Sequence, residues 1–127
     1  MVHNLTRSPE QFVEFYYKTF DQDRTALAPL YRDESMLTFE ATPCQGAPSI
    51  IEKLKGLPFS QIEHQVSTVD AQPSNTSGGI LVVVSGALLV EAEKRPMSYT
   101  QTFQLLPNGQ GSYFIFNDLF RLVYPAA

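Results

Sequence analysis

The sequence contains a single cysteine and no tryptophan, and it has no long hydrophobic run. Cys44 has no partner for an intramolecular disulfide, so an oxidising compartment is not indicated. The longest apolar window, residues 80–84, is far too short to cross a bilayer and is predicted to be a strand. The N-terminus lacks a charged segment followed by an apolar one, so we expect a soluble, intracellular protein.

Several sequence signals of common activities are also missing. There is no glycine-rich phosphate loop, no nucleophile elbow and no Cys/His ligand pair. The two histidines are His3 and His64, so a histidine metal site is not expected, and neither is a cofactor. The net charge of −4 argues against nucleic acid or an anionic membrane as the partner and favours a basic one.

Apolar and aromatic side chains are abundant. Hydrophobic residues make up 43% of the 127 residues, and nine Phe and six Tyr are among them. This composition is typical of a globular protein with a proper core rather than of a disordered chain. Because no repeat, low-complexity tract or linker interrupts the pattern, residues 1–127 are expected to form one domain.

Helix signals are confined to the first half of the chain. Ser8, Pro9 and Gln11 predict a helix start, because serine can cap, proline suits the first turn and Gln can complete a capping box. An apolar, mostly aromatic stripe follows at helical spacing, and it comprises Phe12, Val13, Phe15, Tyr16, Tyr17 and Phe20. A short second helix is predicted after Asp21 or Asp23, carrying Leu27, Leu30 and Tyr31, with its register left open by Pro29. A third helix is predicted from about Pro48 to Gly56.

Strand signals fill the rest, at residues 35–39, 61–72, 80–90, 99–106 and 112–124. Along 61–72, alternation places Ile62, His64, Val66 and Thr68 on one face. The last strand, SYFIFNDLFRLVY, is apolar on two faces: Tyr113, Ile115, Leu119 and Val123 on one, and Phe114, Phe116, Phe120, Leu122 and Tyr124 on the other. Its polar exceptions, Asn117, Asp118 and Arg121, are expected to bond to neighbouring strands or loops. Helices followed by long sequential strands predict an α+β fold, in which a strongly bent, mainly antiparallel sheet wraps the helices and leaves a hydrophobic cavity.

Two groups of residues are candidates for a site. His64 is expected toward the interior or the cavity mouth, where a histidine is more often a hydrogen-bonded core residue than a catalyst. Glu40, Glu91 and Glu93 follow the ends of strands, where charged residues are usually a solvated rim. The functional alternative is an acidic collar around a hydrophobic hole, suited to an aromatic side chain flanked by Lys or Arg.

Four segments together resemble the nuclear transport factor 2 family: FYYKTFDQDRTALAPLYRDESMLTFE (15–40), IIEKLKGLPFSQIEH (50–64), DAQP (70–73) and FNDLFRLVY (116–124). The resemblance covers essentially the whole chain. It implies a cone-shaped α+β fold, a homodimer paired through the outer sheet faces, and a location in the cytoplasm, the nucleus and the nuclear pore. It also implies a non-enzymatic carrier that binds the GDP-bound small GTPase Ran and phenylalanine-glycine repeat nucleoporins.

The resemblance assigns roles to particular residues. Phe39, Glu40, His64, Glu91 and Glu93 match the Ran-binding cavity and rim, and Leu5 matches the position that contacts the nucleoporin repeats. Two residues depart from the family pattern. Glu91 replaces an aspartate. Leu5 replaces an aromatic residue, and because leucine cannot pack edge to face on a phenylalanine ring, weaker binding of the repeats is expected.

Two other functions remain open. The first is a structural subunit that forms a heterodimer in a messenger-RNA export receptor, and for such a subunit an acidic rim is unnecessary. The second is a cavity enzyme, an isomerase or dehydratase, in which His64 would act with Asp70 or Asp118. That alternative rests on fold analogy alone.

Overall fold

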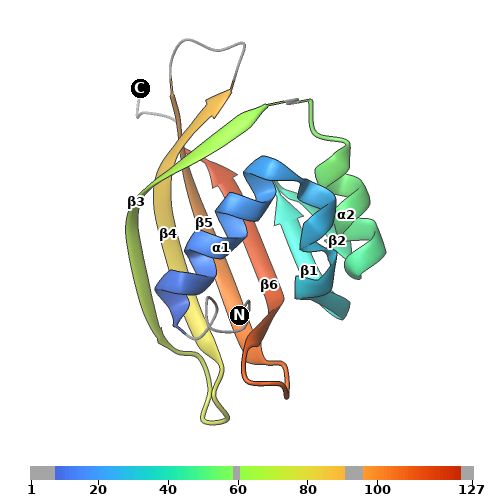
Figure 1. Cartoon of the computed structure of the whole chain (residues 1–127), viewed down its shortest axis with the longest axis vertical. Coiled ribbons are helices and arrows are strands. Elements are labelled where there is room, and N and C mark those ends of the chain that lie inside the picture. The colour runs from blue at the N-terminus through green and yellow to red at the C-terminus, as the bar shows by residue number, and fades with distance from the viewer. Residues whose placement is uncertain (1–7, 59–60, 91–95, 124–127) are drawn as a thin grey trace.

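The computed structural model describes residues 8–58, 61–90 and 96–123. These residues form three helical segments and six strands, which follow one another in the order α1 (Pro9–Gln22), η2 (Arg24–Leu30), β1 (Tyr31–Phe39), β2 (Thr42–Gln45), α2 (Ala47–Lys55), β3 (Ile62–Pro73), β4 (Ile80–Val90), β5 (Met97–Pro107) and β6 (Tyr113–Leu122). Figure 1 shows β3 and β4 bending around α1, while η2 and α2 lie at the opposite side with β1 and β2. The predicted α+β cone is confirmed.

Helix α1 begins as its sequence predicts. The Ser8 side chain accepts a hydrogen bond from the Gln11 amide at 3.1 Å, and Pro9 occupies the first turn. The predicted stripe faces the sheet, and the Phe12 and Tyr16 rings both meet Phe103 edge to face. Five of the six stripe residues are buried, namely Phe12, Val13, Tyr16, Tyr17 and Phe20, whereas Phe15 is only partly buried. The sheet-facing side of α1 is therefore part of the core.

The six strands form one sheet in the order β2-β1-β6-β5-β4-β3. All neighbours are antiparallel except β1 and β6, which run parallel. The short strand β2 was not predicted. Tyr31 was predicted to be helical, but it begins β1, because η2 is a tight 3-10 segment that ends at Leu30.

Bulges overturn two predicted strand faces. The register of β3 shifts between Val66 and Thr68, so Val69, and not Thr68, continues the inner face of His64. A second shift, opposite Gln104 and Leu105, leaves Phe116 of β6 without a register partner. The prediction that Ile115 shares a face with Leu119 is therefore wrong: Ile115 is 0% exposed and Leu119 is 52% exposed.

Asp118 is buried in the centre of the sheet and is hydrogen-bonded from several elements. Tyr31 of β1 donates to it at 2.8 Å, Gln101 of β5 donates at 2.7 Å, and Tyr16 of α1 lies 3.4 Å away. The Tyr17 hydroxyl in turn donates to Gln101 at 2.8 Å. The expectation that Asp118 bonds to its neighbours is confirmed, and this network joins α1 to three strands.

Burial raises the pKa of Asp118 to about 6, although its hydrogen-bond donors act in the opposite direction. The unfolded chain ionises this carboxyl near pH 4. Between these two values the folded state holds a proton that the unfolded state has lost. The contribution of Asp118 to the free energy of unfolding therefore falls as the pH rises from about 4 to about 6.

We predict that Asp118→Asn removes this pH dependence, because an amide does not ionise. The raised pKa corresponds to roughly 3 kcal/mol. From pH 4 to pH 7, the free energy of unfolding of the natural chain should therefore fall by about 3 kcal/mol more than that of the variant. Urea unfolding at both pH values measures it, and identical pH profiles for the two proteins would contradict the prediction.

Candidate binding pocket

A narrow pocket opens between the helices and the sheet, and seven elements or their connections contribute to it. Its lining residues are mainly apolar: Tyr16, Phe20, Leu37, Phe39, Leu54, Leu57, Ile62, His64, Leu88, Gln101 and Phe120. The cavity volume is about 10 Å³, which is room for about one water molecule. The predicted hydrophobic cavity is thus in place, but the chain's own side chains fill most of it.

Stacked aromatic rings line one side of the pocket. Phe39 lies parallel to Phe120 with ring centres 4.6 Å apart, and Phe120 stacks in turn on Tyr99 at 5.5 Å. Phe120 is buried, whereas Phe39 is only partly buried at the end of β1. Phe39 is therefore both a wall of the pocket and the ring nearest to solvent in this stack.

The Tyr16 hydroxyl and the Gln101 amide, two polar groups of the lining, are already hydrogen-bonded to neighbouring side chains. The Tyr16 hydroxyl lies 2.9 Å from that of Tyr31 and also reaches Asp118. Gln101 uses its carbonyl oxygen for Tyr17 and its amide nitrogen for Asp118. Because these groups have partners, the pocket offers a guest mainly apolar and aromatic surface.

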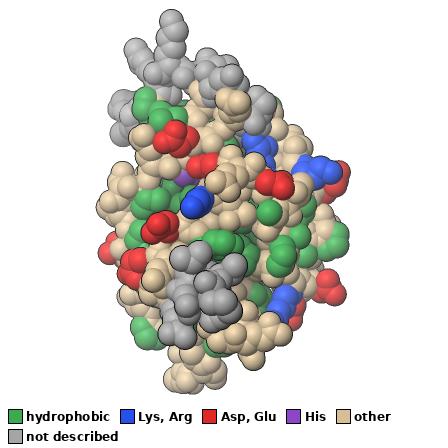
Figure 2. All heavy atoms as spheres, viewed as in Figure 1, with side chains coloured by type: hydrophobic (Ala, Val, Ile, Leu, Met, Phe, Trp, Pro, Cys, Tyr) green, Lys and Arg blue, Asp and Glu red, His purple; other side chains and the backbone are tan. Residues whose placement is uncertain are grey.

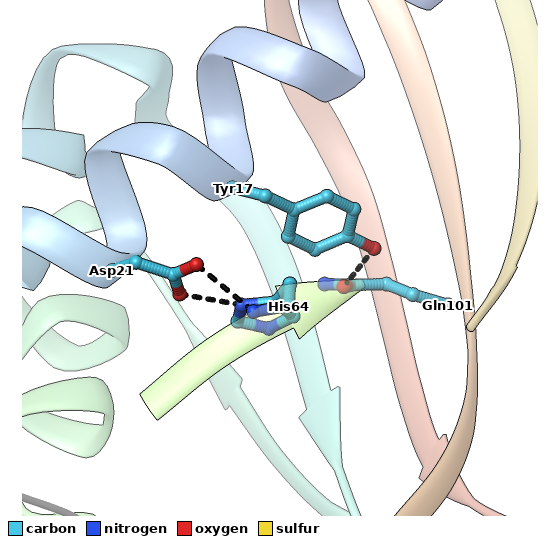
Figure 3. A network of polar contacts seen from close by, with 4 residues as sticks. All are labelled: Tyr17, Asp21, His64 and Gln101. Carbon is cyan, nitrogen blue, oxygen red and sulfur yellow. Dashed lines mark hydrogen bonds and ion pairs between the residues drawn. The ribbon is translucent and has the colours of Figure 1, made fainter. Parts of the chain in front are cut away.

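Asp21, in the last turn of α1, is hydrogen-bonded to His64 of β3 (Figure 3). The Asp21 carboxylate lies 2.7 Å from His64 Nδ1 and accepts the His64 backbone N–H at 2.9 Å. The His64 ring stacks on Tyr17 at 4.3 Å, and its side chain is only 2% exposed. Since a carboxylate can only accept, the neutral ring carries its proton on Nδ1, which leaves Nε2 as an acceptor.

Glu40 lies in the turn between β1 and β2, directly after Phe39. Its backbone has φ 51°, and its N–H donates to the Phe120 carbonyl at 3.1 Å. Its carboxylate accepts a hydrogen bond from the Leu122 amide at the end of β6. Glu40 is thus held beside the pocket, and one of its two carboxylate oxygens already has a partner.

Three of the residues predicted to bind partners lie outside the described residues: Leu5, Glu91 and Glu93. Strand β4, which leads toward the two glutamates, ends at Val90, and the register partner of Val90 is the pocket residue Ile62. Of the predicted Ran-binding residues, the structure therefore brings together Phe39, Glu40 and His64 around one pocket.

Asp21 is the residue that sequence reasoning missed. It was read only as a possible start of the second helix, yet it lies one turn after Tyr17 on the same face of α1, and that spacing was the available signal. The acids proposed to act with His64 are placed otherwise. Asp70 is exposed and pairs with outward-facing Val83, while Asp118 is bonded to Tyr31 and Gln101.

Metal and membrane signals are weak in the part of the chain that the structure describes. No group of three or more His, Cys, Asp or Glu residues lies together there as a metal site would require. Within the same residues, no helix has the length and apolar character needed to cross a bilayer.

Burial raises the pKa of the Cys44 thiol, which disfavours the reactive thiolate.

Comparison with known proteins points to one family. The family model described as the nuclear transport factor 2 (NTF2) domain matches residues 9–122. The nuclear transport factor 2 of Davidiella tassiana is 74% identical over 118 residues, which are 93% of this chain and 94% of that protein. The protein of the same name from Emericella nidulans is 67% identical over 117 residues, 92% of this chain and 94% of that one. The solved nuclear transport factor 2 of Cryptosporidium parvum has a TM-score of 0.84 at 42% identity and covers 90% of both chains.

More distant structures share the fold with other functions. A chain of the Candida albicans Mtr2-Mex67 M domain complex has a TM-score of 0.74 at 15% identity, covering 89% of this chain and 91% of that one. A hexachlorocyclohexane dehydrochlorinase of Novosphingobium barchaimii has a TM-score of 0.73 at 11% identity, covering 88% and 82%. Such low identities show the fold alone.

We predict that Asp21→Ala loosens the contact between α1 and β3. The His64 N–H loses its acceptor, and the free energy of unfolding should fall by about 2 kcal/mol. The fraction of neutral His64 with its proton on Nδ1 should also fall, as nitrogen-15 NMR of the ring can measure. Glu14→Ala, an exposed site on the same helix, is the control, and an unchanged tautomer in Asp21→Ala would contradict the assignment.

Proposed function

Because the chain belongs to the nuclear transport factor 2 family, we propose that it is a non-enzymatic nuclear transport carrier. In this proposal it binds the GDP-bound small GTPase Ran and the phenylalanine-glycine repeats of nucleoporins, and it carries Ran into the nucleus. It would then be found in the cytoplasm, in the nucleus and at the nuclear pore. The identity of 74% to a curated nuclear transport factor 2 is the single observation that carries this function.

The pocket supports the proposal through its chemistry. An aromatic side chain of Ran would enter among Phe39, Phe120 and His64, beside the Tyr16 and Gln101 side chains whose polar groups already have partners. A buried ring of this kind commonly anchors an interface and contributes about 2–4 kcal/mol. Because the free cavity is only about 10 Å³, entry of a ring requires side chains at the mouth to move, and the partly buried Phe39 and Leu57 are placed to do so.

The rim would supply orientation and selectivity. Glu40 is fixed next to Phe39, and Glu91 and Glu93 are proposed as its acidic partners around the opening. Basic residues beside the inserted ring would pair with these carboxylates, and charge-assisted hydrogen bonds of this type are stronger than neutral ones. The nucleotide dependence would arise in the GTPase, whose switch segment must present the ring only in the GDP form.

The outer face of the sheet is proposed as the homodimer surface. Val83 of β4 is 40% exposed and Leu119 of β6 is 52% exposed, although both lie in the middle of the sheet. Exposed apolar groups on a flat surface are typical of a protein interface. Pairing two such faces would cover both, and Leu5 of each chain is proposed to contact nucleoporin repeats.

The two other functions have less support. A heterodimeric export subunit is favoured only by a fold match at 15% identity. A cavity enzyme would need His64 beside Asp70 or Asp118, but the carboxylate bonded to His64 is that of Asp21. The relatives from Davidiella tassiana and Emericella nidulans carry the name of a transport factor.

We predict that Glu40→Gln weakens binding of GDP-loaded Ran about tenfold, because it removes the charge and keeps an oxygen for the Leu122 amide. Isothermal calorimetry with Ran loaded with GDP or GTP measures the effect. Glu34→Gln makes the same charge change at an exposed site of β1 and should leave the affinity unchanged. Equal affinities for Glu40→Gln and the natural chain would remove the rim from the proposal.

We predict that Leu119→Glu converts a homodimer to a monomer, because two carboxylates would be forced into an apolar contact between the sheets. Sedimentation equilibrium of the natural chain and the variant gives the two masses. Val123→Glu, which changes a comparably exposed residue beyond the end of β6, tests whether the position matters. A natural chain that sediments as a monomer at all concentrations would refute the homodimer.

A further inference from the structure

A second hollow lies between α1 and β3, outside the aromatic pocket. Its volume is about 490 Å³, and its floor is formed by Val13 and Tyr17 of α1 with Val66 and Val69 of β3. Strand β3 ends the sheet, so no further strand of the described chain covers this side. Val66 faces inward toward α1 but is 44% exposed, which leaves an apolar side chain in solvent at the centre of the groove.

Acidic side chains border this groove on both sides. Glu10 and Glu14 stand one turn apart on α1, and Glu63 stands on β3. Among the described residues, none of these three carboxylates has an ion-pair partner, and Lys18 is the one basic residue of the groove. Figure 2 shows acidic side chains gathered over α1 and β3, with hydrophobic surface between them and few basic side chains nearby.

An apolar floor bordered by carboxylates that lack ion-pair partners among the described residues favours a guest that is both apolar and positively charged. A negatively charged guest, such as nucleic acid or an anionic lipid, would be repelled by a groove with an excess of carboxylates. An extended peptide places alternate side chains on opposite sides, so it can lay an apolar residue on Val66 while the lysines or arginines beside it point to the open side of the groove and bend over its edge to Glu10 and Glu14. Asp21 joins α1 to β3 at His64, and both residues also line the groove.

We propose that the groove between α1 and β3 binds an extended, basic segment of another protein through an apolar anchor on Val66. This site is distinct from the proposed Ran pocket and from the proposed dimer surface. The groove lies on the inner side of the sheet, whereas Val83 and Leu119 lie on the outer side. A homodimer therefore leaves the groove of each chain accessible.

The test uses a short blocked peptide in which lysine and valine alternate, labelled with a fluorophore, and the full-length protein. Fluorescence anisotropy gives the affinity, and nitrogen-15 NMR gives the location of binding. We expect saturable binding that weakens as salt rises, with the largest amide shifts at Val13, Glu14, Val66 and Val69. The glutamate-valine peptide of the same length should not bind.

Matched variants distinguish specific binding in the groove from non-specific attraction of a basic peptide to an acidic protein. Glu10→Gln with Glu14→Gln should weaken binding about fivefold, because two exposed ion pairs are lost. Asp33→Asn with Glu34→Gln makes the same charge change at exposed sites on β1 and should leave the affinity unchanged. Val66→Ser, at a site that is already partly exposed, should also weaken binding about fivefold by removing the anchor.

Three results would overturn the proposal. Equal losses in the α1 and β1 charge variants would show non-specific attraction to an acidic protein. Unchanged affinity in Val66→Ser would show that the groove floor takes no part. Self-association of the protein that Val66→Ser abolishes would assign the groove to a second copy of this chain instead. Because the readout is peptide binding, it is independent of Ran, and failure of either proposal can be told from failure of the other.

Discussion

The arrangement of this fold depends on satisfying one buried carboxylate, that of Asp118. An ionisable group in an apolar interior costs several kcal/mol unless donors surround it. Here the donors come from α1, β1 and β5, so the carboxylate is satisfied only when the helix and the strands are in their native places. The requirement acts over long sequence separations, since Tyr16 and Asp118 are 102 residues apart. It also fixes the depth at which α1 lies in the curved sheet.

This network decides the character of the aromatic pocket. Tyr16 and Gln101 reach the pocket, but their polar atoms are occupied by Asp118, Tyr17 and Tyr31. The same hydrogen bonds that hold the helix therefore leave a surface that recognises shape and apolar character. The carboxylate bonded to His64, that of Asp21, belongs to the junction of α1 and β3. In the proposed function, selectivity for a partner therefore falls to charged residues around the opening, of which Glu40 is the described example.

Much of this architecture could be predicted from the sequence. Helical spacing located α1, alternation located β3, and apolar runs bounded by turn residues located β4, β5 and β6. The errors in strand faces arose where a single unpaired residue reverses a face, at the bulges near Val66 and Phe116, since a bulge has no pattern of its own in one sequence. For the site, Phe39 and His64 line one pocket and Glu40 directly follows Phe39, while their predicted role in binding a partner stays a prediction. Asp21 was missed because its partner is 43 residues away.

The pocket and the groove share a wall, which limits how independently they can act. His64 lines both hollows, and Asp21 fixes its ring and its backbone from α1. A ring that enters the small pocket must displace side chains, and any displacement that reaches His64 also changes the wall of the groove. A guest at one site changes the affinity of the other site only if it favours a different position of His64. The effect of the first guest on the second must then equal the effect of the second on the first. The Asp21–His64 contact, which resists that movement, therefore sets how far one partner can influence the other.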